Sequence, residues 1–204
     1  MMTDNYIFDF GMVLIDFNMP YMTSVYVEDK EDAQLVESVV FDREYWNRLD
    51  AGTITDDEVK QQVCARLPER LHELACKVYD NWYKNLLPIN GMYDLIDELK
   101  AKGKKLYLLS NISNKFAENY SEVQHINDVF SKFDGLVFSA PLGLVKPNRE
   151  IFDYLLDKYG LEAQDCTFID DNKDNIAAAE SLGINTYLFD VNAEKLREYI
   201  KGDM

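Results

Sequence analysis

The chain has 204 residues, of which 47% are hydrophobic and 13% aromatic, enough apolar side chains to form a buried core in a domain of ordinary size. Lys and Arg number 21 and Asp and Glu 37, which gives a formal net charge of −16. Because this charge repels nucleic-acid phosphates and anionic lipids, we expect neither nucleic acid nor a membrane surface as a partner.

The three cysteines show neither the C-x-x-C spacing of a zinc site nor the even count of a disulfide framework. This pattern favours reduced thiols in a reducing compartment. The first residues lack the charged and apolar segments of a signal peptide, and no stretch approaches the about 20 apolar residues of a membrane-spanning helix. We therefore expect a soluble, cytoplasmic protein, whose oligomeric state the sequence does not indicate.

Five short apolar runs predict strands that are covered on both faces, because they lack the polar alternation of a sheet with one exposed face. They occupy residues 6–8, 105–109, 136–138, 166–169 and 185–189. Apolar residues at helical spacing fill the intervals between the later runs, over 92–99, 151–159 and 176–182. Strands that alternate with helices predict an α/β fold with a Rossmann-like, doubly wound parallel sheet.

The interval between the first two strands, residues 9–104, is far longer than the dozen or so residues that a crossover connection needs. Helical patterns fill much of it, over 32–40, 55–67 and 69–83. We therefore expect residues 17–87 to form an inserted helical cap, and residues 1–16 with 88–204 to form the α/β core. The turn-forming segment Asn18-Met19-Pro20 and Pro88 are the expected hinge points.

Polar side chains follow four of the predicted strands, at the edge where open α/β sheets bind their ligands. In chain order they are Asp9-Phe10-Gly11, Ser110-Asn111, Lys146-Pro147 and Asp170-Asp171-Asn172. Taken singly, each has a structural explanation, such as a turn or a helix cap. Their convergence on one edge of the sheet indicates an active site.

These four segments resemble the ordered motifs of the haloacid dehalogenase superfamily. With their flanking residues, the first motif is Phe8-Asp9-Phe10-Gly11-Met12-Val13 and the fourth is Phe168-Ile169-Asp170-Asp171-Asn172. The helical insertion after the first strand resembles the cap that is common in that superfamily. In detail, the Asp-x-Gly, Ser-Asn and Asp-Asp-Asn motifs resemble a subgroup that contains alpha-glucose-1-phosphate phosphatases.

The resemblance implies that Asp9 is a nucleophile that attacks phosphorus and becomes an aspartyl phosphate. Ser110 and Lys146 would complete the catalytic set, with Ser110 donating a hydrogen bond to phosphate and Lys146 adding positive charge. Together with Asn111, these two residues would form the substrate-binding set. Backbone amides at the turn into the next helix would assist Ser110.

The resemblance also implies a magnesium ion held by Asp9, the backbone carbonyl of Gly11 and Asp171. Hard oxygen ligands suit Mg²⁺, which commonly binds one or two carboxylates together with phosphate. Asp170 would lie outside the coordination shell and orient a metal-bound water. The cation would shield Asp9 from the anion that it attacks.

One position departs from the superfamily pattern. Phosphatases of this superfamily usually carry a second Asp two residues after the nucleophile, as general acid and base, and here that position is Gly11. A positioned acid–base is worth about 10²–10⁴ in rate. A leaving group that is easily expelled, such as that of a sugar 1-phosphate, needs less protonation. A metal-bound water or a residue of the cap would otherwise replace the missing acid, and Asp16 is one candidate.

Three functions remain open at this stage. The sequence favours a magnesium-dependent phosphatase that acts on a small phosphorylated metabolite, such as a sugar phosphate, through an aspartyl-phosphate intermediate. The first alternative is a binding or regulatory protein that has lost catalysis. The second is a 2-haloacid dehalogenase, which also lacks the second Asp, but the acidic pair Asp170-Asp171 argues against it.

In the cap, Arg43, Tyr45, Trp46 and Trp82 are candidate specificity residues, although aromatic residues at helical spacing favour packing within the cap itself.

Overall fold

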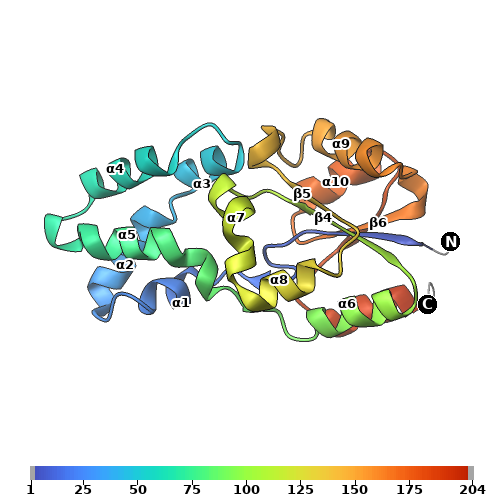
Figure 1. Cartoon of the computed structure of the whole chain (residues 1–204), viewed down its shortest axis with the longest axis horizontal. Helices are drawn as coiled ribbons and strands as arrows, with labels where there is room; N and C mark the ends of the chain where they lie inside the picture. Colours follow the sequence, from blue (N-terminus) through green and yellow to red (C-terminus); the bar gives the residue numbers. More distant parts are fainter. Residues whose placement is uncertain (1–2, 202–204) are drawn as a thin grey trace.

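The structure, a computed structural model, describes residues 3–201. It has two lobes along its longest axis (Figure 1). One lobe holds a parallel sheet with helices on both faces, and the other consists of helices from the first half of the chain. Both described termini lie at the far end of the sheet-containing lobe, away from the helical lobe (Figure 1).

The main sheet has five parallel strands. Its centre is β1 (Asn5–Phe8), which pairs with β4 (Lys105–Ser110) on one side and with β6 (Cys166–Asp170) on the other. With β5 (Gly135–Phe138) and β7 (Asn185–Leu188) at the edges, the order is β5-β4-β1-β6-β7. The predicted α/β fold class and the five predicted strands are confirmed.

The two faces of the sheet bury different side chains because neighbouring residues of a strand point to opposite sides. Ile7 packs with apolar residues of α9 (Arg149–Tyr159) and α10 (Lys173–Ser181). Tyr6 and Phe8 pack with α6 (Met92–Ala101), α8 (Gln124–Phe130) and α11 (Ala193–Ile200). The helices accordingly form two layers, one on each side of the sheet (Figure 1).

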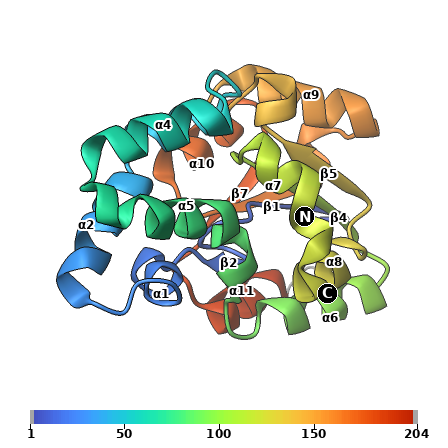
Figure 2. The ribbon, with the colours of Figure 1, turned by 60° about the vertical axis from the view of Figure 1, so that its left-hand side comes forward.

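The helical lobe contains α1 (Met19–Ser24), α2 (Lys30–Val40), α3 (Arg43–Asp50), α4 (Asp56–Arg66) and α5 (His72–Asn81), followed by a 3₁₀ turn over Trp82–Asn85. Figure 2 shows α2, α4 and α5 grouped beside the sheet. The helical patterns over 32–40, 55–67 and 69–83 are confirmed as α2, α4 and α5. The two short helices, α1 and α3, are not predicted by the sequence patterns, because each spans only about two turns, fewer residues than a helical period needs to be recognised.

The segment Asn18-Met19-Pro20, whose composition is typical of a turn, begins a helix in the structure, and its role as a hinge point stays a prediction. Asn18 instead caps α1: its side-chain oxygen accepts a hydrogen bond from the backbone N–H of Tyr21 at 3.0 Å. Proline is tolerated in the first turn of a helix because its missing N–H has no partner there in any case. The segment that predicts a turn therefore begins a helix.

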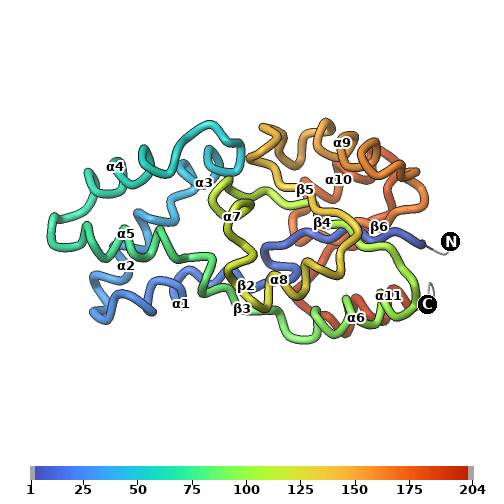
Figure 3. Tube along the Cα trace, viewed as in Figure 1, coloured from blue at the N-terminus to red at the C-terminus, as the bar shows by residue number. Residues whose placement is uncertain are grey.

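The chain passes between the lobes twice, and the two crossings pair with each other. The strands β2 (Ile15–Asp16) and β3 (Leu87–Pro88) form a two-stranded antiparallel ribbon. Figure 3 shows this ribbon between the helical lobe and the main sheet. It lies at the expected ends of the insertion, at residues 17 and 87. That residues 17–87 act as a separate cap stays a prediction.

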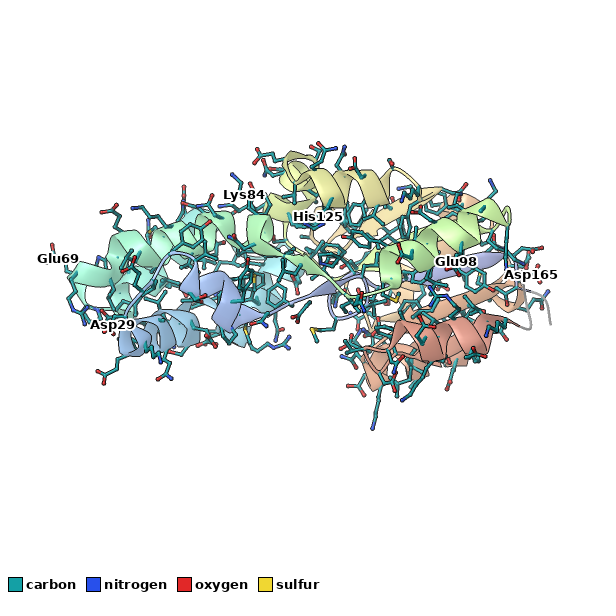
Figure 4. The ribbon with its side chains drawn as sticks, turned by 90° about the horizontal axis from the view of Figure 1, so that it is seen from below. Asp29, Glu69, Lys84, Glu98, His125 and Asp165 are labelled. Atoms are coloured by element: carbon teal, nitrogen blue, oxygen red, sulfur yellow. The ribbon has the colours of Figure 1, made fainter. Side chains whose placement is uncertain are left out.

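The two lobes share one apolar core. Phe116, in the short helix α7 (Asn114–Asn119), has no exposed surface, and its ring contacts Phe10 after β1, Trp82 of the helical lobe and Phe130 of α8. Asp29 and Glu69 lie at the outer end of the helical lobe, and Asp165 lies at the opposite end of the molecule (Figure 4). Within residues 3–201, no helix is long and apolar enough to span a bilayer.

Truncation of Phe116 should destabilise the whole molecule, because it removes a fully buried ring at the junction of the two lobes. We expect Phe116→Ala to lower the free energy of unfolding by about 3–5 kcal/mol. The matched change Phe116→Leu, which keeps most of the volume, should cost roughly 1.5 kcal/mol. Urea unfolding followed by circular dichroism measures both, and equal losses for the two variants would contradict this role.

Candidate active site

A cavity of about 530 Å³ opens at the carboxyl end of the sheet and is lined by both lobes. The register explains its position: Phe8 of β1 lies beside Leu108 and Ile169, so the residues that follow these strands emerge at one edge. All six residues that the sequence predicts for catalysis, substrate binding or metal binding line this cavity: Asp9, Gly11, Ser110, Asn111, Lys146 and Asp171.

Lys146 is the centre of the site. It is 4% exposed, and its Nζ lies 2.8 Å from Asp9 Oδ1 and 2.7 Å from Asp170 Oδ2. Burial alone would lower the pKa of Lys146, but the charges of Asp9 and Asp170 raise it. Lys146 is therefore held as an ammonium ion that contacts both carboxylates.

Asn111 fixes the backbone of Lys146. Its side-chain oxygen accepts the N–H of Lys146 at 2.8 Å, and its Nδ2 donates to the carbonyl of Lys146 at 2.9 Å. The sequence predicts Asn111 as a substrate-binding residue. In the structure Asn111 lines the cavity, but both ends of its amide hold the loop that carries Lys146.

Three carboxylates, Asp9, Asp170 and Asp171, have oxygen atoms within 4.8 Å of one another. Those of Asp170 are already engaged by Lys146 Nζ, by the side-chain amide of Asn175 and by the backbone N–H of Asn172. Asp9 and Asp171 are left as the better-placed ligands for a cation. Such hard oxygen donors fit Mg²⁺. That Asp170 lies outside the coordination shell stays a prediction.

Two carboxylates of this cluster, Asp9 and Asp171, have a pKa above the ordinary range. Burial raises the pKa of Asp9, which is 9% exposed, against the opposing charge of Lys146. Burial and the neighbouring charge of Asp170 raise the pKa of Asp171. One buried ammonium therefore does not balance three carboxylates, and a divalent cation would complete the balance of charge.

Ser110 lies at the end of β4 and is 1% exposed. Ser139, just after β5, holds the loop that follows Ser110. The N–H of Ser139 donates to the carbonyl of Ser110 at 3.0 Å, and the Ser139 hydroxyl accepts the N–H of Ile112 at 2.8 Å. The N–H of Ile112 is therefore not one of the backbone amides that could bind phosphate beside Ser110. Ser139 is buried and belongs to no sequence motif, so sequence reasoning missed it.

The helical lobe contributes the opposite wall of the cavity. Trp46 and Trp82 pack edge to face, with ring centroids 5.0 Å apart, and both are almost fully buried, as the helical spacing of the aromatic residues favours. Both also line the cavity, together with Arg43. Tyr45 does not belong to the lining; its hydroxyl accepts a hydrogen bond from Arg66.

Asp50, the last residue of α3, also lines the cavity and was missed by sequence reasoning. It is half-buried, and burial raises its pKa to about 7, although the charges of Arg43 and Lys146 oppose this. Asp16, which the sequence offers as a replacement acid, lies in the ribbon beside Leu87 and is not part of the lining.

Comparison with known proteins identifies related sequences over most of the chain. The family model for haloacid dehalogenase-like hydrolases matches residues 3–183. A sesquiterpene phosphatase of Aspergillus oryzae is 27% identical over 178 residues, which cover 87% of this chain and 85% of that protein. A D-ribitol-5-phosphate phosphatase of Bacteroides thetaiotaomicron is 27% identical, covering 91% of each chain. A HAD-family enzyme of Bacteroides thetaiotaomicron, whose structure was solved as the magnesium complex, superimposes with a TM-score of 0.71 at 23% identity. The superposition covers 98% of this chain and 100% of that one.

The raised pKa of Asp50 predicts a pH-dependent effect on stability. Because the folded protein binds this proton more tightly than the unfolded chain, ionising Asp50 lowers wild-type stability as the pH rises from about 4 to about 7. Asp50→Asn removes the effect. In the presence of a chelator, the variant should therefore gain roughly 1–2 kcal/mol over wild type across this range, since one pKa unit equals about 1.4 kcal/mol and partial exposure reduces the total.

Urea unfolding at several pH values measures the difference between the two proteins. Asp57→Asn is the matched control, because that side chain of the helical lobe is 89% exposed. A difference between Asp50→Asn and wild type that does not change with pH would show that Asp50 is not desolvated in the folded protein.

Proposed function

This chain belongs to the haloacid dehalogenase-like hydrolases, and from that membership and the geometry of the cavity we propose that it is a magnesium-dependent phosphatase. The observation that carries the proposal is the contact of Lys146 Nζ with Asp9 and Asp170, beside the carboxylate of Asp171. A nucleophilic carboxylate, a fixed cation and a pair of oxygen ligands are the groups that phosphoryl transfer from a dianion requires.

In this mechanism Asp9 attacks phosphorus and becomes an aspartyl phosphate, which water then hydrolyses. Lys146 neutralises charge on Asp9 and on the transferring group, and Ser110 donates a hydrogen bond to a phosphate oxygen. Asn111 keeps Lys146 in place through its two hydrogen bonds to the lysine backbone. When held by Asp9, Asp171 and the carbonyl of Gly11, Mg²⁺ supplies the positive charge that lets one anion approach another.

Residues 17–87 act as a cap that covers the reaction site and selects the substrate. Support comes from the position of the helical lobe, which forms the cavity wall opposite the carboxylates with Arg43, Asp50 and Trp46. The ribbon of β2 and β3 joins this cap to the core. A cap in this position limits the access of water to the reacting groups, which strengthens the electrostatic interactions between them.

The substrate is a small phosphorylated metabolite. A sugar or polyol phosphate is one candidate: the first, second and fourth motifs resemble those of glucose-1-phosphate phosphatases, and one relative acts on D-ribitol 5-phosphate. A second candidate is an isoprenoid phosphate. The cavity wall favours it, because Phe17, Met19, Phe41 and Trp46 offer an apolar surface to the leaving group, and another relative is a sesquiterpene phosphatase. With its three unpaired cysteines, the enzyme works in the cytoplasm.

The central role of Asp9 predicts that Asp9→Asn abolishes turnover. We expect phosphate release to fall at least ~10⁴-fold while the fold is kept, because the amide cannot replace the nucleophile. Phosphate release from sugar 1-phosphates, polyol phosphates and isoprenoid phosphates, with and without Mg²⁺, tests this and ranks the two substrate classes. Retained activity in Asp9→Asn would contradict the mechanism. No release by wild type from any of them would favour a binding or regulatory protein instead.

Asp171→Ala should act chiefly through the metal. Loss of one charged ligand should raise the Mg²⁺ concentration needed for half-maximal rate by about tenfold or more, equivalent to at least about 1.4 kcal/mol of binding free energy. Excess Mg²⁺ should restore much of the rate, and calorimetry should show the weaker binding directly. Asp174→Ala, which removes a cavity carboxylate outside the three-carboxylate cluster, is the matched control. An unchanged Mg²⁺ requirement in Asp171→Ala would show that Asp171 is not a ligand.

A further inference from the structure

The cavity has room where the usual second carboxylate would stand. Gly11 follows the nucleophile by two residues and lines the cavity. Among the described residues, no atom beyond its chain neighbours lies within 4 Å of where a Cβ at position 11 would be. A side chain at this position would meet open space. An acidic side chain from another part of the chain therefore has room to approach the reacting groups here.

Asp50 approaches the same cavity from the helical lobe. It ends α3, lines the cavity with Asp9, Ser110 and Lys146, and is half-buried. Its carboxyl group is close enough to Lys146 and Arg43 for both charges to act on its ionisation. Asp50 therefore lies on the same cavity as the predicted catalytic residues, within electrostatic reach of Lys146.

The position of Asp50 is fixed by contacts with the core. Its carbonyl accepts the hydroxyl of Ser139 at 2.7 Å, and the N–H of Ser139 donates to the carbonyl of Ser110 at 3.0 Å. Two residues further on, Gly52 has a φ of +67°, and a Cβ there would lie 2.6 Å from the carbonyl oxygen of Ala140. This close approach needs glycine. The end of α3 is thus held against the segment after β5, which in turn bonds to Ser110.

The other carboxylates of the cavity are less suited to transfer a proton. Asp9 and Asp171 are assigned to the nucleophile and the cation, and the oxygens of Asp170 are engaged by Lys146, Asn172 and Asn175. Asp174 is exposed in the first turn of α10, and neither histidine lines the cavity. Asp50 is half-buried, and burial raises its pKa to about 7, so that both its protonated and its ionised form are present near neutral pH.

We propose that Asp50 is the general acid and base of this enzyme and replaces, from the helical lobe, the carboxylate that position 11 lacks. This assignment rests on the phosphatase function proposed above. It makes Asp50 a catalytic residue and makes the seating of α3 on Ser139 a condition for turnover.

The proposed proton transfers balance over the cycle. In the first step the bond from Asp9 to phosphorus forms, the bond from phosphorus to the leaving oxygen breaks, and protonated Asp50 gives its proton to that oxygen, releasing an alcohol. In the second step water attacks phosphorus, its proton passes to the Asp50 carboxylate, and the bond between Asp9 and phosphorus breaks. Inorganic phosphate leaves, and both aspartates return to their starting states.

The test compares Asp50→Asn with wild type, both with Mg²⁺, on two phosphate esters that each carry an aromatic ring, one an aryl ester and the other an alkyl ester. 4-Nitrophenolate leaves without protonation, whereas the alkoxide of 2-phenylethyl phosphate requires it. We expect Asp50→Asn to lose about 10²–10⁴ in rate on 2-phenylethyl phosphate. On 4-nitrophenyl phosphate it should give a rapid burst of about one nitrophenolate per active site, followed by a slow phase, because the second step lacks its base.

Equal losses on both esters without a burst, or an unchanged rate on 2-phenylethyl phosphate, would overturn the role of Asp50. A wild-type protein that hydrolyses only the nitrophenyl ester would also overturn it, because such an enzyme has no proton donor. If wild type released no phosphate from either ester, the phosphatase proposal itself would fail, which separates the two outcomes. Asp57→Asn is the matched control, Asp50→Glu should restore part of the alkyl-ester rate, and thermal unfolding verifies that each variant is folded.

Discussion

One buried ammonium, Lys146 Nζ, holds two carboxylates together at the carboxyl end of the sheet, at 2.8 Å from Asp9 and 2.7 Å from Asp170. Removing water from such charges is costly, and only mutual contact and additional hydrogen bonds offset the cost. The fold supplies these: β1 and β6 emerge side by side, Asn111 clamps the lysine backbone, and Asn175 and the N–H of Asn172 occupy the oxygens of Asp170. The remaining negative charge, on Asp9 and Asp171, is what makes the site fit a divalent cation.

A second set of contacts joins the helical lobe to this cluster. Ser139 bonds to the carbonyl of Ser110 in the core and to the carbonyl of Asp50 at the end of α3, while Gly52 allows the two backbones to meet. Phe116 fills the apolar junction nearby. These contacts set where the cavity wall stands relative to Asp9. If Asp50 and the cap have the roles proposed above, the same contacts connect the geometry of the helical lobe to the chemistry and to substrate selection.

The sequence predicts those features that depend on local pattern. Continuous apolar runs identify the five strands, and strand ends place Asp9, Ser110 and Asp171 at one edge, because parallel strands share their carboxyl edge. Lys146 reaches the same edge on the loop that follows β5. The sequence does not predict α1 and α3, which are too short for a helical pattern to be recognised, nor Ser139 and Asp50. The roles of these two residues come from contacts between segments about 90 positions apart, as in the bond from Ser139 to the carbonyl of Asp50, and no local pattern encodes such a contact. Asn111 is correctly placed in the cavity, but its two bonds to Lys146 become visible only in three dimensions.

The central claim is that Asp9 carries the phosphoryl group. The most direct measurement is a single turnover with Mg²⁺, quenched in acid within milliseconds and reduced with borohydride, which converts an aspartyl phosphate to homoserine. Mass spectrometry of the peptide that contains residue 9 then locates the modification. The account predicts homoserine at position 9, present only when substrate is added. Phosphate release with an unmodified Asp9, or with the modification at another aspartate, would contradict it.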